Sequence, residues 1–195
     1  MQGKVEVSWR GNLNWSNIRG LVFLHTLAAV AIWYLAFVQF HWATIALAFV
    51  WYGLTGLSIT AGYHRAFTHR AYEVSAALRW FYLIFGAGAL QTSLLQWSVD
   101  HRNHHRFSDQ EGDPYGVRNG FWWAHVGWIL RNRHGYEDPP LDIVRDLADL
   151  PGVKFQHKFY DVLGLSVAFL LPAGLAFLWG DPWGGCLVAG ALRAV

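Results

Sequence analysis

The chain has 195 residues, of which 54% are hydrophobic and only 14% are charged, and its formal net charge is +2. Soluble domains carry about 25% charged residues, so the composition argues against a protein surrounded by water and favours one surrounded largely by lipid. The single cysteine, Cys186, excludes a disulfide framework and a cysteine-based zinc site. We also expect no nucleic-acid partner.

Two long apolar runs follow a polar start. Residues 21–40 contain only His25, Thr26 and Gln39 as mildly polar exceptions, and residues 42–61 contain no charge. A helix of about 20 apolar residues is long enough to cross the hydrocarbon core of a bilayer. We therefore predict transmembrane helices at about 21–40 and 42–61, rather than two buried helices of a soluble core.

The segment 63–161 has a different character, because it holds 11 of the 15 Lys and Arg residues. Within it, residues 78–95 are apolar but include Arg79, Gly86, Gly88 and Gln91, so we predict a helix lying in the membrane interface. A third crossing is predicted at 162–179, and a fourth begins at 183–195 after the turn at 180–182. We expect a single domain over 1–195, an all-α membrane protein with a cytosolic helical cap.

The basic residues predict the orientation. Lys4, Arg10 and Arg19 precede the first crossing, and the basic segment follows the second, whereas the predicted turns near Gln39 and Gly180 carry no Lys or Arg. Basic residues concentrate on the cytosolic side of membrane proteins. We therefore predict a multi-pass integral membrane protein with its N-terminus and the segment 63–161 in the cytosol.

Five of the ten histidines lie in two clusters, the first with His64 and His69 and the second with His101, His104 and His105. Neutral imidazole is the commonest protein metal ligand, and several together predict a metal site. Proton-relay or headgroup-binding histidines are the alternative interpretation.

Spacing bears on how many metal ions these histidines would hold. On a helix, residues four apart share a face, whereas adjacent residues diverge, and we expect His64 and His69, five apart, to diverge as well. Five histidines in divergent pairs favour two metal ions lying between helices over one. Iron, copper, nickel and zinc all accept imidazole, so the spacing does not identify the metal.

The flanking residues carry a resemblance to a known family. The stretch AGYHRAFTHR (61–70) resembles the first histidine box of the membrane fatty acid desaturases, and WSVDHRNHHRFSD (97–109) resembles the second. DPY (113–115), GFWWAHVGW (120–128) and KFQHKFY (154–160) are similar to the Δ9, stearoyl-CoA-type branch of that family. The resemblance runs from about residue 53 to the chain end.

This resemblance implies four membrane helices under a cytosolic cap, and two non-haem irons that insert a cis double bond, at the Δ9 position, into a saturated acyl chain using O2 and two electrons. The implied iron ligands are His64, His69, His101, His104 and His105. The resemblance further implies that Gln91 and Trp97 line the bent part of an acyl tunnel. Aspartates are candidate partners for the imidazole N–H groups, with helix caps or surface carboxylates as the alternative, and the candidates are Asp100, Asp109 and Asp113.

The resemblance also makes three arginines candidates for the phosphate-bearing end of an acyl thioester, and arginine suits this role because a planar guanidinium binds phosphate through two parallel hydrogen bonds. They are Arg102, Arg106 and Arg118. The alternative is that they form an ordinary solvated or headgroup-facing surface.

The sequence departs from the family pattern in one large respect. The family's third box, an HxxHH motif further along, is missing, and so are an Asn and an additional His of a later helix. The run 183–195 is also too short to span a bilayer. We therefore expect a fragment, or a prematurely ended reading frame, that carries little activity.

Partners and rival functions complete the expectations. No cofactor motif for electron transfer occurs in the sequence, so we predict a separate donor of the cytochrome b5, ferredoxin or rubredoxin type, besides an acyl thioester or lipid substrate and membrane lipid. The rivals are a related alkane or sterol hydroxylase, a membrane metal-binding or transport protein, and an inactive truncated desaturase.

Overall fold

The computed structural model describes residues 12–131 and 141–195, so Lys4, Arg10 and His134 lie outside the described residues. In the described ranges the chain is helical, and extended backbone pairs only in an isolated antiparallel bridge between Leu13 and Arg131. The predicted all-α class is confirmed. The α-helices are α1 (Trp15–Phe37), α2 (Trp42–Leu57), α3 (Ala76–Ala87), α4 (Leu94–Phe107), α5 (Arg145–Ala148), α6 (Pro151–Lys158), α7 (Tyr160–Leu165), α8 (Leu171–Ala176) and α9 (Pro182–Gly184).

Helical segments with other hydrogen-bonding patterns connect or extend these helices. Wide π-helical segments are η1 (Ser58–Thr68), η3 (Trp123–Gly127), η5 (Ser166–Leu170) and η7 (Gly185–Ala191). Tight 3₁₀ segments are η2 (Val117–Asn119), η4 (Leu141–Val144), η6 (Phe177–Trp179) and η8 (Leu192–Ala194).

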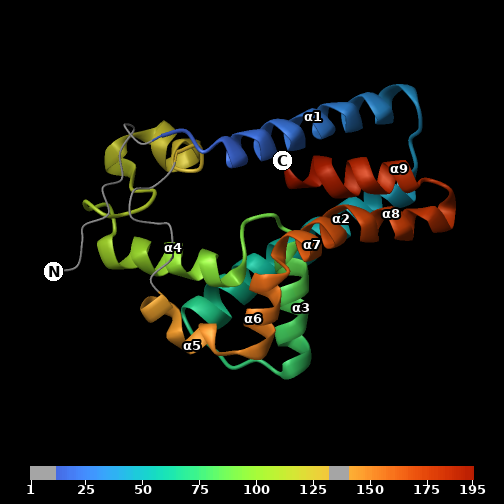
Figure 1. Ribbon diagram of the computed structural model, residues 1–195. Coiled ribbons are helices and arrows are strands. Elements are labelled where there is room, and N and C mark those ends of the chain that lie inside the picture. The colour runs from blue at the N-terminus through green and yellow to red at the C-terminus, as the bar shows by residue number, and fades with distance from the viewer. Residues whose placement is uncertain (1–11, 132–140) are drawn as a thin grey trace.

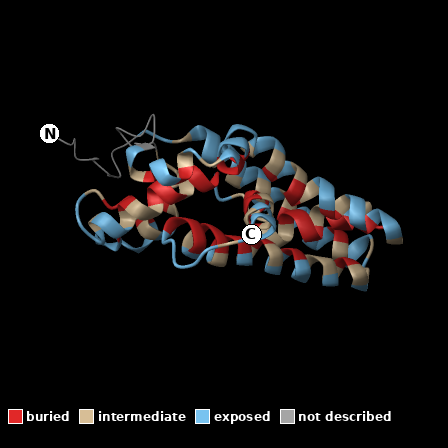
Figure 2. Cartoon of the chain, turned by 90° about the horizontal axis from the view of Figure 1, so that it is seen from below, coloured by how far each residue is buried: buried red, intermediate tan, exposed pale blue. Residues whose placement is uncertain are grey.

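Three continuous helices are long and apolar enough to cross a membrane, and they span Trp15–Phe37, Trp42–Thr68 and Tyr160–Trp179. Together with the C-terminal helical segment they pack side by side at one end of the molecule (Figure 1). The first helix starts before residue 21 because Asn14 caps it, accepting the N–H of Asn17. Most of its large apolar side chains are exposed (Figure 2), as is expected of a helix that faces lipid.

The predicted single helix over 78–95 is wrong, because the structure divides it into α3 and α4. Gly88 ends α3, and the connecting turn places Leu90 and Thr92 in the left-handed region, with φ of 60° and 73°. Ser93 then starts α4, since its side chain accepts the N–H of Gln96. This break lets α4 run in a new direction and carry the second histidine cluster.

The core of the cap lies where η1, α3, α4 and the segment from η4 to α6 meet. Its largest fully buried side chains include Tyr63, Leu83, Leu94 and Val99. Gln156 of α6 accepts the N–H of Leu94 at 2.9 Å and donates to the carbonyl oxygen of Leu83 at 3.0 Å. The two helices that carry the histidine clusters are therefore anchored to one packed core.

Candidate metal centre

The first histidine cluster lies at the end of the π-helical segment η1. In this segment backbone bonds join residues five apart, and the N–H of His69 donates to the carbonyl oxygen of His64 at 3.0 Å. Residues five apart are then about one turn apart on the same side of the helix. The predicted divergence of His64 and His69 is therefore wrong, and their Nε2 atoms lie 3.0 Å apart.

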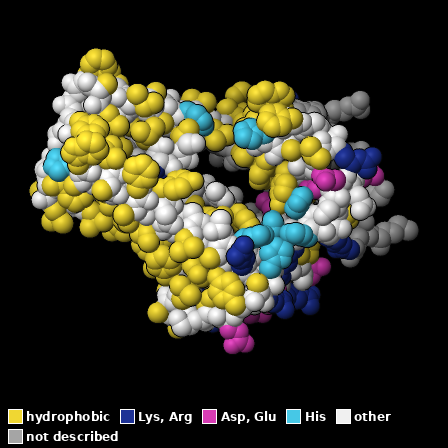
Figure 3. Space-filling view, turned by 180° about the vertical axis from the view of Figure 1, so that it is seen from behind, with side chains coloured by type: hydrophobic (Ala, Val, Ile, Leu, Met, Phe, Trp, Pro, Cys, Tyr) yellow, Lys and Arg dark blue, Asp and Glu magenta, His cyan; other side chains and the backbone are white. Residues whose placement is uncertain are grey.

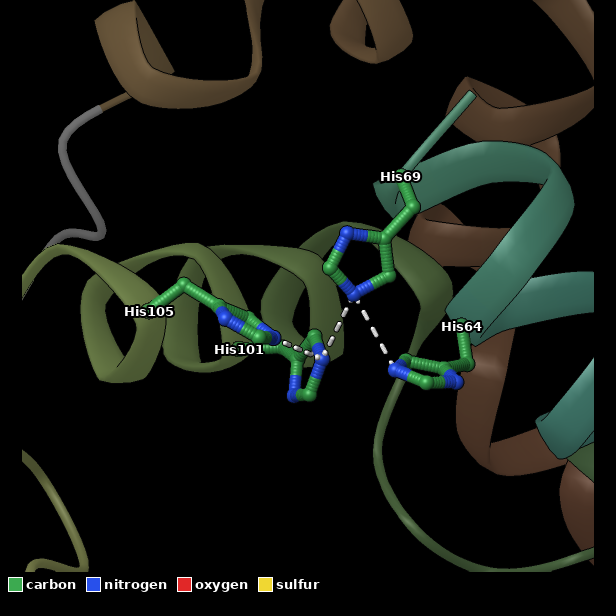
Figure 4. A group of neighbouring side chains, drawn as sticks. All are labelled: His64, His69, His101 and His105. Atoms are coloured by element: carbon green, nitrogen blue, oxygen red, sulfur yellow. Dashed lines mark hydrogen bonds between the residues drawn. The ribbon is translucent and has the colours of Figure 1, made fainter. Parts of the chain in front are cut away.

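The second cluster, on α4, meets the first (Figure 4). His101 and His105 share a face of the helix, and their Nε2 atoms are 3.1 Å apart. The Nε2 of His101 is also 3.1 Å from the Nε2 of His69. One ligand atom from each of the four histidines falls within 4.8 Å of the others. The structure thus brings His64, His69, His101 and His105 together. They lie at the end of the molecule where charged side chains gather on the surface (Figure 3).

Hydrogen bonding alone does not account for these contacts. In a neutral imidazole each ring nitrogen either donates one hydrogen or accepts one. The Nε2 atoms of His69 and His101 each lie close to two other nitrogen atoms. A cation removes the conflict, because an ion about 2.1 Å from two imidazole nitrogens at a right angle places them about 3.0 Å apart. The donor set therefore fits a metal ion.

The electrostatics keep these imidazoles ready to bind a cation. Burial, and then the neighbouring histidines, lower the pKa of His101 to about 3. Burial and its neighbours also lower the pKa of His69. Both rings are therefore neutral near pH 7, which is the form that binds metal.

His104 stands apart from the other four ligand candidates. Its Nδ1 lies 3.0 and 2.9 Å from the two carboxylate oxygens of Asp113, a side chain that is fully buried. The ring of Tyr115 stacks on His104 with ring centres 4.6 Å apart. The structure thus places one of the three candidate aspartates against a ligand candidate, while Asp109 accepts the N–H of Val117 and Asp100 lies near Gln96.

The two predicted tunnel residues occupy different surroundings. Trp97 stacks on His101 with ring centres 4.7 Å apart and lies 6.1 Å from the ring of His64. Gln91 is exposed on the turn between α3 and α4. The structure therefore brings Trp97, but not Gln91, into contact with the histidines.

The three predicted phosphate-binding arginines also differ. Arg106 and Arg118 are exposed, the first over the ring of Phe107 and the second in η2. Only 17% of the Arg102 side chain is exposed, and it binds Asp146 of α5. Neither the histidine spacing nor the motifs pointed to Asp146, because 44 residues separate it from Arg102 in the sequence.

Comparisons with known proteins show which family this sequence resembles. The family model described as fatty acid desaturase matches residues 40–194. The chain is 39% identical to a probable acyl-CoA desaturase of Schizosaccharomyces pombe, covering 96% of this chain and 39% of that protein. It is 36% identical to acyl-CoA desaturase 1 of Saccharomyces cerevisiae, covering 95% and 36%. It is 35% identical to acyl-CoA Delta-9 desaturase of Acheta domesticus, covering 90% and 49%.

The chain thus spans between about a third and a half of the length of these three relatives. The family model nevertheless covers most of the sequence, including both histidine clusters. The helical fold, with three helices able to cross a membrane, agrees with an integral membrane protein. The chain therefore belongs to the fatty acid desaturase family.

Proposed function

We propose that this chain forms the part of an acyl-CoA desaturase that holds the metal centre, and that the enzyme introduces a cis double bond at the Δ9 position of a saturated acyl chain. The observation that carries the proposal is the convergence of four imidazoles from two separate helices. The names of the relatives, acyl-CoA desaturases and a Delta-9 desaturase, support the substrate and the position of the bond.

The residues divide between two iron ions in this proposal. His64, His69, His101 and His105 would hold one of them, and His104, oriented by Asp113, would contribute to the other. When bound there, two such ions would supply the oxidising power, drawn from O2, that an unactivated C–H bond requires. Trp97 would place the acyl chain beside the histidines and exclude water there, and Gln91 would line the bend of the tunnel.

The proposed substrate and electron donor both approach from the cytosol. Arg106 and Arg118 are exposed on the cap and would meet the phosphates of the thioester, while Arg102 is the weakest of the three candidates because its guanidinium is bound internally. Electrons would come from a separate protein of the cytochrome b5, ferredoxin or rubredoxin type. An acidic donor protein of this kind would be attracted by the basic cytosolic surface of the chain.

Metal content and product mass test the proposal separately. The protein in lipid nanodiscs should retain iron, and His101→Ala should lose it, whereas His25→Ala, on the exposed surface of α1, should not. Given a saturated acyl-CoA, O2 and a reducing system, the product should be two hydrogens lighter. A product heavier by one oxygen would indicate the related hydroxylase, and iron retention in His101→Ala would remove the metal assignment.

A further inference from the structure

The guanidinium of Arg102 uses all of its hydrogen-bond donors inside the protein. An arginine side chain has five N–H groups. Those of Arg102 donate to the backbone oxygens of Phe67, Thr68 and Ile143 and to both carboxylate oxygens of Asp146, at 2.7 to 3.2 Å. A phosphate could therefore be bound by this side chain only if some of these bonds were broken.

The acceptors identify what Arg102 holds in place. Phe67 and Thr68 are the last residues of η1, and His69 follows directly. The final carbonyl groups of a helix lack partners within the helix, and a cation there satisfies them and interacts favourably with the helix dipole. Arg102 itself follows His101 on α4. One side chain thus connects the backbone beside one ligand candidate to the helix that carries another, and their Nε2 atoms are 3.1 Å apart.

The residue on the other side of His69 is bound to the same group. Arg70 lies in the left-handed region with φ of 52°, which is uncommon for a residue other than glycine. Such a conformation persists only where its surroundings hold it. The side chain of Arg70 bonds to Asp146 at 2.9 Å through Nε and at 2.7 Å through a terminal nitrogen. Both neighbours of His69 are therefore tied to the unit that Arg102 and Asp146 form.

We propose that Arg102, together with Asp146 and Arg70, acts as a clamp that fixes His69 against His101 and so sets the geometry of the metal site. Arg102 is a positioning residue in this proposal, not a contact for substrate phosphate. The inference rests on the proposed function in one respect, namely that the four histidines bind a metal ion.

Conservative variants separate the clamp from a general effect of charge. Arg102→Lys keeps the positive charge but cannot make five bonds in the planar geometry of a guanidinium. Asp146→Asn keeps the shape of the carboxylate but loses its charge. The matched controls are Arg145→Lys and Asp142→Asn, because both residues are exposed and lie in the same segment as Asp146. Circular dichroism in nanodiscs verifies that each variant retains its helix content.

Cobalt(II), whose visible spectrum reports ligand geometry, provides the metal readout. Arg102→Lys and Asp146→Asn should weaken cobalt binding 10- to 100-fold, the range found when the supporting partners of metal ligands are changed, and should alter the spectrum of the bound ion. Both controls should bind as the unaltered protein does. Unchanged affinity and spectrum in Arg102→Lys would overturn the clamp. An increase in KM for acyl-CoA with unaltered cobalt binding would instead assign Arg102 to substrate.

Hydrogen exchange tests the clamp without any metal. The N–H groups of His69 and Ala71 donate to the carbonyl oxygens of His64 and Arg65, so they exchange slowly while the end of η1 is held. Arg102→Lys should speed exchange in residues 67–71 while exchange in α1 stays as it was. If the unaltered protein bound no cobalt, the proposed function would fail, and the exchange experiment would still decide the clamp. Unchanged exchange in residues 67–71 would contradict it.

Discussion

His104 and His105 are adjacent on α4, but their side chains contact different neighbours. His105 points toward His69, with ring centres 4.7 Å apart, whereas His104 points toward Asp113. A carboxylate can only accept, so the Nδ1 of His104 is the donor, and its Nε2 keeps a lone pair for a metal ion. The same Asp113 side chain accepts the backbone N–H groups of Asp109 and Tyr115. It therefore fixes both the imidazole and the loop after α4.

The charge of Asp146 should make the stability of the cap depend on pH. Burial would raise the pKa of this carboxyl, but the hydrogen bonds and charges of Arg102 and Arg70 outweigh burial and hold the pKa below its ordinary value of 3.8. A carboxyl with a lowered pKa in the folded protein stabilises the fold above its unfolded pKa, and this contribution is lost as the pH falls further.

The measured quantity is the difference in unfolding temperature between Asp146→Asn and the unaltered protein. From pH 7 to about pH 5, Asp146→Asn should unfold at a lower temperature than the unaltered protein by a constant amount. The difference should shrink as the pH falls below about 4, near the unfolded pKa of aspartate. Thermal unfolding followed by tryptophan fluorescence measures it, and Asp142→Asn is the control. A difference that stays constant down to pH 3 would show that the charge of Asp146 contributes nothing.

At the scale of whole elements, α3 and η1 approach so closely that glycine is needed at their contact. A Cβ atom at Gly86 would overlap the ring of Tyr63, which is fully buried next to His64. Gly86→Ala should therefore destabilise the protein by about 1–3 kcal/mol, the usual cost of overpacking a core. Gly53→Ala is the matched control, because a Cβ atom there meets nothing within 4 Å. Equal unfolding temperatures for the two variants, in the same nanodiscs, would show that the contact relaxes without cost.

The segment η1 shows which features could be predicted from the sequence alone and which could not. The long apolar runs predicted the helical class, and the two histidine clusters predicted which segments would carry a metal site, because the composition of these segments is visible in the sequence. The π-helical pairing of His64 and His69 could not be predicted, since the sequence alone does not show that the backbone bonds would run between residues five apart. Arg102 had a motif-based interpretation, whereas its actual partner Asp146 depends on tertiary packing.

For the whole molecule, the two ends differ in their side chains: charged side chains gather at the end with the histidine clusters, and apolar side chains cover the other end (Figure 3). Among the described residues that line the apolar end, one carboxylate is buried, and several donors share it. Asp181 accepts from Tyr34 of α1, from Thr44 of α2 and from the N–H of Gly184 in α9. A buried charge is tolerated when such donors surround it. The bundle is thus tied together at the end that lacks the histidine clusters.

This arrangement predicts which end faces the cytosol. Eleven of the 15 basic residues lie between residues 63 and 161, and the turns at the other end carry none, so the histidine end should be cytosolic. In a Cys186→Ala background, single cysteines at Glu73 and at Val38 would report the two ends, because both positions are exposed and Val38 follows α1 directly. A maleimide that cannot cross membranes should label Glu73→Cys in sealed vesicles whose cytosolic face points outward. It should label Val38→Cys only after detergent opens them. The reverse pattern would contradict the predicted orientation, and labelling of both positions in sealed vesicles would contradict the crossing of the helix Trp42–Thr68, which lies between them.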